Sequence, residues 1–141
     1  MPSITRNPKP NRPLERDVQA AVREWLATQP DVTIFRNAQA YVQFPDGHKA
    51  RTGLGTGSAD LIGSLTYKRI LTDRHRYDET KDTYMTVARA LGIEIKRPGE
   101  RLDPDQITWH DEMRRRGWVV GVAHSVDEAR DTIERARRFE I

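Results

Sequence analysis

The sequence predicts an α/β fold, with a mixed central β-sheet flanked by helices, and three observations support this prediction. A stripe of apolar residues at helical spacing opens the domain, several strand-like segments follow it, and two capped helices surround an apolar strand near the C-terminus. The succession of strand, helix and strand predicts a parallel pair with a right-handed crossover. The length of 141 residues suits one domain with one core.

Residues 1–13 are predicted to form a flexible basic arm ahead of a single domain at residues 14–141. The arm is rich in proline and carries three basic residues and no acidic one. The whole chain has a formal net charge of +3, so the domain itself is formally neutral. A DNA-binding surface on the domain must therefore come from local clusters of basic residues.

The helices are predicted from apolar spacing and from capping residues. They are expected at residues 14–29, 103–117 and 125–138. Asp103 and Gln106 are spaced as a capping box, and Ser125 with Glu128 repeats this spacing at the last helix. One face of the helix after Asp103, with Trp109 or His110 on it, is expected to pack on the sheet.

The strands are predicted from runs of branched and aromatic residues between turn signals. They are expected at residues 32–36, 41–44, 48–51, 59–67, 83–96 and 118–123. The segments 41–44 and 48–51 are predicted to form a hairpin around the turn at Asp46. A polar excursion at residues 68–82 separates two paired strands. The segment 118–123 is apolar throughout, which favours a central position in the sheet.

The composition excludes several classes of site. The chain has no cysteine, so disulfides and thiolate metal sites are ruled out. It has no apolar run of the roughly 18 residues that a membrane span needs. The first residues lack the apolar stretch of a secretory signal. The expectation is a cytoplasmic protein, in the host cytoplasm if a phage encodes it.

Asp60, Glu94 and Lys96 point most directly to chemistry. All three belong to apolar strand segments, where an unpaired charge is costly. Glu94 and Lys96 are two positions apart, so both project from one strand face while Ile93 and Ile95 enter the core. A divalent metal beside a phosphodiester would be a partner for the two acids. The simpler interpretations are a surface ion pair on an edge strand and, for Asp60, an aspartate that caps its own turn.

Three motifs follow one another along the chain, namely GLGTGSADLIG at residues 53–63, GIEIKRPG at 92–99 and LDPDQ at 102–106. Together they resemble the VRR-NUC family, the virus-type replication and repair nuclease branch of the PD-(D/E)XK superfamily. Stand-alone members of this size resemble those that bacteriophages encode. The resemblance implies a restriction-endonuclease-like fold. The chain departs from the superfamily at Ala59, where a proline usually precedes the first aspartate without serving as a ligand.

The resemblance also implies roles for individual residues. Asp60 and Glu94 would bind Mg²⁺ or Mn²⁺, with the backbone carbonyl of Ile95 completing the inner shell. Lys96 would hold and polarise the attacking water or stabilise negative charge at the phosphate.

Gln106 and Glu15 are further candidates for the site. The family has a glutamine at the position of Gln106, near the metal, and this role is compatible with the capping box. The family often has a glutamate at the position of Glu15 that contacts a metal or its water. The simpler interpretation of Glu15 is an acid favoured by the start of a helix. Glu24, in the middle of the same helix, is interpreted as a solvated residue.

The glycine-rich segment at residues 53–57 does not match a nucleotide-binding loop, because it leads into a strand and lacks the Lys-Ser/Thr ending. Its glycines are expected to let the backbone approach DNA or the metal closely. Four residues near this segment are candidate DNA contacts, namely Arg36, Asn37, Gly57 and Ser58.

The sequence thus predicts a metal-dependent endonuclease that hydrolyses DNA phosphodiester bonds. Family analogy favours branched or Holliday-junction-like DNA in viral replication, recombination or repair, and paired cuts favour a homodimer. Two alternatives remain open. One is a non-catalytic nucleic-acid-binding protein on a degenerate nuclease fold, and the other is a sequence-specific restriction-type endonuclease.

Overall fold

A computed structural model describes residues 12–70 and 84–141. All but the last two residues of the predicted arm lie outside the described residues, as does residue range 71–82 of the predicted polar excursion. Residues 68–70, which were expected to open that excursion, belong instead to a strand that is longer than predicted. No helix among the described residues is long and apolar enough to cross a membrane.

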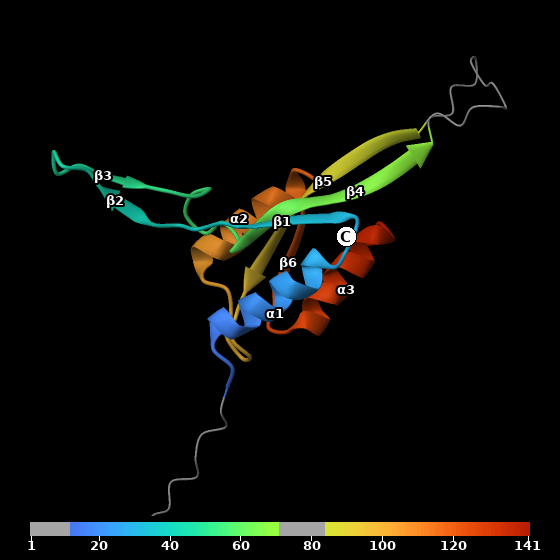
Figure 1. Ribbon diagram of the computed structural model, residues 1–141, viewed down its shortest axis with the longest axis horizontal. Coiled ribbons are helices and arrows are strands. Elements are labelled where there is room, and N and C mark those ends of the chain that lie inside the picture. The colour runs from blue at the N-terminus through green and yellow to red at the C-terminus, as the bar shows by residue number, and fades with distance from the viewer. Residues whose placement is uncertain (1–11, 71–83) are drawn as a thin grey trace, which may run out of the picture.

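The predicted fold class is confirmed, since a mixed sheet is flanked by three helices (Figure 1). In chain order the elements are α1 (Glu15–Ala27), β1 (Val32–Arg36), β2 (Tyr41–Gln43), β3 (Lys49–Arg51), β4 (Leu61–Ile70), β5 (Tyr84–Ile95), α2 (Pro104–Arg115), β6 (Val119–Ala123) and α3 (Val126–Arg137).

The main sheet has the strand order β1-β4-β5-β6 in the described part of the chain. The pairs β1–β4 and β4–β5 are antiparallel, and β5–β6 is parallel, as the strand–helix–strand succession predicted. Strands β2 and β3 form a separate antiparallel hairpin that extends away from the body of the molecule (Figure 1). The Asp46 side chain accepts the His48 backbone N–H at 3.1 Å, which confirms the predicted turn.

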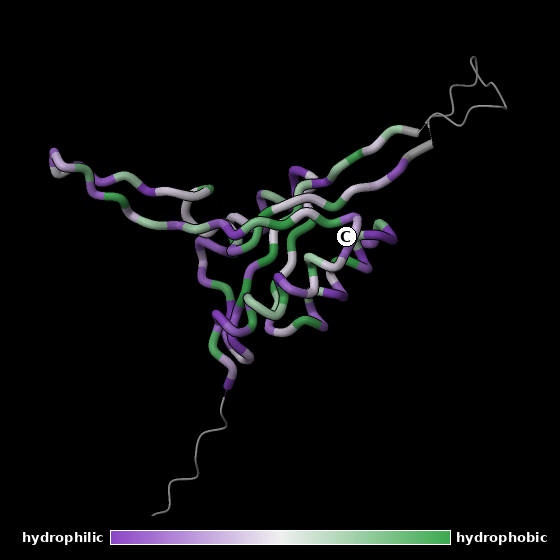
Figure 2. Tube along the Cα trace, viewed as in Figure 1, coloured by the Kyte–Doolittle hydropathy of each residue, from purple (hydrophilic) through white to green (hydrophobic). Residues whose placement is uncertain are grey.

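The hydrophobic core lies between one face of the sheet and helices α1 and α3. It takes alternate residues of β5, since Leu91, Ile93 and Ile95 are fully buried in it. Figure 2 shows hydrophobic segments gathered in the strands at the middle of the molecule, while the helices alternate between hydrophobic and hydrophilic segments. This alternation is the pattern of helices that bury one face.

Helix α2 covers the other face of β5. Its Trp109 ring lies so near Gly92 that a Cβ at Gly92 would come within 3.2 Å of the ring. Because successive strand residues point to opposite faces, Gly92 and Glu94 share the side that α2 covers. The register of β5 therefore turns Glu94 away from the main core and toward the helix that carries Gln106.

Two element-level expectations were wrong. The apolar strand β6 lies at the edge of the described sheet and not at its centre. It is buried all the same, because α2 and α3 both pack against it. At α3, the Ser125 side chain caps the backbone N–H of Glu128, but the Glu128 carboxylate accepts from the N–H of His124 instead of closing the box at Ser125.

Candidate active site

The site forms where β4 begins and β5 ends. These strands run antiparallel, with Leu61 opposite Ile93. Asp60 comes just before Leu61 and Glu94 just after Ile93, so the two acids come together at one end of the sheet. The Asp60 carboxylate accepts the backbone N–H of Ile95 at 2.8 Å. This bond holds Asp60 beside the strand end, at the edge of a cleft that Asp60 lines.

Glu94 is buried, with 2% of its surface exposed. Burial and the nearby Asp60 together raise the pKa of Glu94 to about 8, although the charge of Lys96 opposes them. Its Oε2 atom has no hydrogen-bond partner among the described residues. The anionic form of Glu94 is therefore only partly compensated among the described residues, which is the condition under which a buried acid favours a bound cation.

Lys96 lies on the same side as Glu94, although β5 ends one residue before it. Its Nζ is 3.9 Å from Glu94 Oε1, and its side chain is only 14% exposed. The alternative of a surface ion pair on an edge strand is wrong, because β5 is an inner strand of the sheet and both side chains are largely buried.

Gln106 makes both of the contacts that were considered for it. Its Oε1 accepts the backbone N–H of Asp103 at 3.0 Å, which closes the predicted capping box of α2. Its Nε2 donates to Glu94 Oε1 at 2.5 Å. Since the cap holds the amide oxygen, the amide NH₂ is directed at Glu94. Helix α2 thus carries a donor into the site through its own first turn.

A cleft of about 480 Å³ opens in front of these residues. Asp60, Glu94 and Gln106 line it on one side, and Glu15, from the first turn of α1, lines it on another. Partial burial and the charge of Asp60 raise the pKa of Glu15. Across residues 12–70 and 84–141, however, no three acidic, histidine or cysteine side chains form a compact metal cluster, so Glu15 faces the cleft without joining the Asp60–Glu94 pair.

Asn37 and Ser58 belong to the architecture of the cleft. The Asn37 amide donates to Ser58 Oγ at 2.8 Å and to the Ala59 carbonyl at 2.9 Å. Ser58 is buried, and its hydroxyl also accepts from Gln39 and donates to the Gly55 carbonyl. Both side chains, predicted as DNA contacts, are therefore engaged in holding the loop that leads to Asp60.

Gly57 and Arg36 occupy different positions around the same cleft. Gly57 has a φ of +77°, and a Cβ there would lie 2.3 Å from the Asp105 carbonyl oxygen. The close approach expected of the glycines is thus made to the backbone of α2. Arg36 is exposed at the end of β1 and is a free cation for the cleft within the described part of the chain.

His110 was expected at most to pack on the sheet, and the structure places it beside the site. It is fully buried, and its Nε2 is 4.0 Å from Glu94 Oε2. Burial lowers the pKa of His110 to about 4. Its position four residues after Gln106, on the same helix face, is the signal from which its place could have been inferred.

Sequence reasoning also missed Arg16, Gln19 and Gln39, which line the cleft. Arg16 and Gln19 lie within one turn of Glu15 on α1, so helical spacing from that residue would have found Gln19. Gln39 follows β1 in a segment without periodic pattern, and no sequence signal marked it.

The residues present fit a divalent cation of the hard, oxygen-preferring type. Asp60 and Glu94 supply carboxylate oxygens, and Glu94 Oε2 lacks a partner among the described residues. The Ile95 carbonyl belongs to the residue whose N–H holds Asp60. A buried and poorly compensated glutamate, with a half-buried aspartate and one lysine beside it, has the composition of such a site.

A model of the VRR-NUC domain family matches residues 5–127 of the chain. This match covers most of the predicted arm, all the residues that line the cleft and the start of α3. Searches among curated proteins and among solved structures found no match.

Proposed function

The chain belongs to the VRR-NUC domain family and is thereby a nuclease domain that binds nucleic acid, and we propose that it is a metal-dependent endonuclease. The proposed reaction is hydrolysis of DNA phosphodiester bonds in the cleft between α1, β4, β5 and α2. The observation that carries the proposal is the buried Glu94, which lines an open cleft together with Asp60 and whose Oε2 has no hydrogen-bond partner among the described residues. Lys96 lies on the Oε1 side of the same carboxylate.

Two carboxylates and one backbone carbonyl would bind the cation. Asp60 and Glu94, with the Ile95 carbonyl, would hold Mg²⁺ or Mn²⁺, and Glu15 would contact the metal or its water across the cleft. When bound, the metal supplies Lewis acidity and lowers the pKa of a coordinated water. The Ile95 N–H fixes one Asp60 oxygen, and the Gln106 amide fixes one Glu94 oxygen. Each acid therefore keeps one oxygen for the cation.

Lys96 and Gln106 would have different roles, one through its positive charge and the other through its hydrogen-bond donor. The Lys96 ammonium lies 3.9 Å from the Glu94 carboxylate, whose negative charge would hold it at the site. It would orient the attacking water or stabilise negative charge on the phosphate. Gln106 positions Glu94 from the second helix. Arg36, exposed at the rim, would meet the phosphate backbone.

We propose that the substrate is branched or otherwise structured DNA in viral replication, recombination or repair. Contacts to the phosphate backbone fix the orientation of a protein on DNA without reading base sequence, which suits recognition of a branched shape.

We also propose a homodimer, because paired cuts in two strands require two sites and the chain carries one Asp60–Glu94 pair. Light scattering with and without four-way DNA measures this directly. A mass of two chains is expected, and a mass of one chain under both conditions would count against the dimer.

The function is tested by incubating linear, forked and four-way DNA with Mg²⁺, Mn²⁺ or EDTA, using the native protein and Asp60→Ala. Metal-dependent cutting of the branched substrates by the native protein alone is expected. If the native protein binds DNA but cuts no substrate with either metal, the non-catalytic alternative is correct. Cutting that survives Asp60→Ala would reject the site.

A further inference from the structure

We propose that the β2–β3 hairpin is a nucleic-acid-binding arm that stacks unpaired bases beside the cleft. The inference deepens the proposed function and rests on it for the nature of the ligand. It assigns the hairpin residues Tyr41, Phe44 and Arg51 to recognition of a substrate in which bases leave the duplex next to the bond that is cut.

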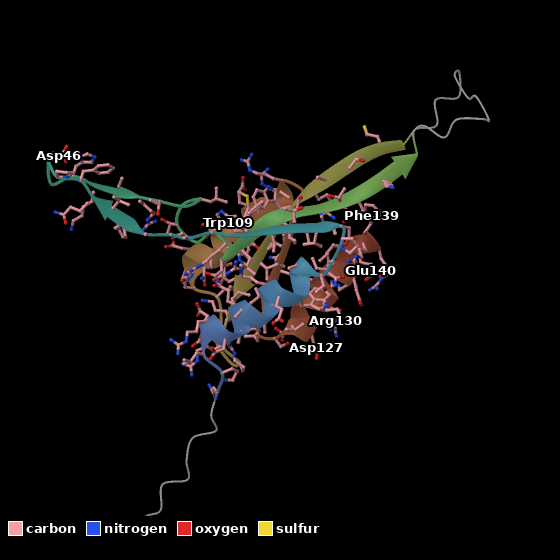
Figure 3. The ribbon with its side chains drawn as sticks, in the orientation of Figure 1. Asp46, Trp109, Asp127, Arg130, Phe139 and Glu140 are labelled. Atoms are coloured by element: carbon pink, nitrogen blue, oxygen red, sulfur yellow. The ribbon has the colours of Figure 1, made fainter. Side chains whose placement is uncertain are left out.

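The hairpin begins and ends at the cleft. The segment that enters it contains Asn37 and Gln39, and the segment that leaves it contains Thr56 and Gly57, all of which line the cleft. The hairpin then extends away from the sheet, with Asp46 at its tip far from the C-terminal end of α3 (Figures 1 and 3). A strand of nucleic acid that leaves the cleft on this side would run along the hairpin.

Its aromatic side chains are exposed instead of buried. Tyr41 is 69% exposed and Phe44 is 41% exposed, although both are large apolar rings. Neither belongs to the hydrophobic core. Because these exposed aromatic rings on a two-stranded ribbon contribute nothing to the core, they are available to a partner.

Each ring is already paired with a cationic or ionisable partner across the hairpin. The Arg51 guanidinium lies 5.0 Å from the centre of the Tyr41 ring, and it donates to the Tyr41 hydroxyl at 2.5 Å. The Phe44 and His48 rings stack with centres 4.3 Å apart and planes 11° from parallel. These pairs hold flat π surfaces in place, which lowers the entropic cost of stacking a base on them.

The charge of the hairpin complements phosphate. Strand β3 carries Lys49 and Arg51, Arg36 precedes the hairpin, and Asp46 is the one acid between residues 36 and 58. Arg51 also donates to Thr56, which lines the cleft, so the same cation joins the hairpin to the site. Because the domain as a whole is formally neutral, this local excess of positive charge distinguishes the hairpin from the rest of the domain.

Aromatic rings and basic residues on one ribbon favour unpaired bases over an intact duplex. Bases within a duplex are covered on both faces by their neighbours, whereas an unpaired base has a free face for stacking. Basic groups beside the rings then hold the phosphates of the same strand. The ligand class is therefore a nucleic acid with a short unpaired stretch next to a duplex.

The test measures binding without cleavage, in EDTA, by fluorescence anisotropy. Two labelled DNAs are compared, a plain duplex and the same duplex with an unpaired strand at one end. The variants are Tyr41→Ala with Phe44→Ala, and Tyr41→Phe with Phe44→Tyr, which keeps both rings. Phe139→Ala is the matched control, because Phe139 is also exposed and lies at the other end of the molecule (Figure 3).

The double alanine variant is expected to weaken binding of the unpaired-strand DNA roughly tenfold to a hundredfold. Its binding of the plain duplex should change by no more than about twofold, and the ring-keeping variant and Phe139→Ala should bind both DNAs as the native protein does. A 2-aminopurine base in the unpaired strand should lose fluorescence on binding the native protein and not on binding the double alanine variant.

Equal weakening for both DNAs, or no weakening beyond that of Phe139→Ala, would overturn the inference. Conversion of a dimer to monomers by the double alanine variant would also overturn it, since the rings would then serve a second copy of the chain. Because binding is measured without metal, stacking on the hairpin can hold even if no DNA is cut. Cleavage with a hairpin that does not bind would leave the proposed function intact.

Discussion

Gln106 connects folding and chemistry through the two ends of one amide. Its oxygen completes the cap of α2 at Asp103, and its nitrogen donates to Glu94. The sequence predicted the cap from spacing alone, and the resemblance predicted the nearness to the metal site. Gln106 can cap α2 and contact Glu94 at once only because of how α2 packs against β5, which sequence spacing does not specify.

Replacing Gln106 with leucine should separate these two roles. The variant loses part of a cap and the donor to Glu94, so we expect hydrolysis to fall about 10–100-fold. The free energy of unfolding should fall by about 1 kcal/mol. Ser125→Ala is the control, because it removes a cap of the same kind at α3, away from the cleft.

The control should lose similar stability and keep its cleavage rate at a temperature where both variants are folded. Comparable loss of cleavage in both variants would mean that Gln106 acts only as a cap.

Glu94 should make the metal-free protein less stable as the pH rises. Its folded-state pKa of about 8 lies above the ordinary value of 4.5, so the folded state binds this proton more tightly than the unfolded state does. The stabilising contribution is complete below pH 4.5 and is lost as the pH rises toward 8. Glu94→Gln removes the titration and keeps the shape.

In EDTA, urea unfolding of Glu94→Gln and of the native protein should agree near pH 4.5. At pH 8.5 the variant should be more stable by roughly 1–3 kcal/mol. His110 titrates in the opposite sense between about 4 and 6.5, but it is present in both proteins and cancels in the difference. A difference that does not vary with pH would show that Glu94 is compensated in the folded protein.

At the scale of elements, the loop before β4 decides where Asp60 lies. Asn37, Gln39 and Ser58 tie this loop together, and Gly57 lets it approach the first turn of α2. The glycine-rich composition was visible in the sequence. The neighbour of Gly57 was not, because Asp105 is distant along the chain and only the packing of α2 brings it close.

Gly57→Ala should therefore cost far more stability than Gly55→Ala. Both glycines have positive φ, at +77° and +99°, so both variants carry a left-handed alanine worth about 1–2 kcal/mol. Only the Gly57 variant adds a clash, with the Asp105 carbonyl, while the Gly55 variant meets nothing within 4 Å. The clash should cost about 1–3 kcal/mol more.

Urea denaturation of the two variants measures this difference. Equal losses of stability would show that the loop can move away from α2 without cost.

The same scale explains which elements could be predicted. The helices, the hairpin turn at Asp46 and the parallel β5–β6 pair follow from capping residues, turn chemistry and chain order. The position of β6 at the edge did not follow, because helices on both faces give an edge strand the same apolar pattern as a central one. At α3, the Glu128 carboxylate accepts the backbone N–H of His124 and not that of Ser125, which spacing alone did not indicate.

At the scale of the whole molecule, the fold gathers residues that are remote in sequence at one end of a sheet. Asp60 directly precedes β4, Glu94 belongs to β5 and Gln106 to α2. Glu15 lines the same cleft from α1. The motifs predicted the first three, because acids are unusual in apolar strands and because the family has a glutamine at the position of Gln106. The spacing from Gln106 could have placed His110 on the same helix face, but spacing alone does not distinguish a core histidine from a neighbour of the site.

Stability and function are linked through one residue of the molecule, Glu94. The same buried acid that destabilises the metal-free fold at high pH is the proposed cation ligand. A site of this kind is expected to lower stability where it serves activity.

The most direct test of the central claim compares Glu94→Gln with Glu24→Gln in the cleavage of four-way DNA with Mn²⁺. Glu24 is an exposed acid in the middle of α1, so it controls for the loss of one negative charge. The account predicts that Glu94→Gln loses cleavage by at least about a hundredfold while it binds the DNA and gains stability at pH 8.5, and that Glu24→Gln cuts as the native protein does. Cleavage by Glu94→Gln at the native rate would contradict it.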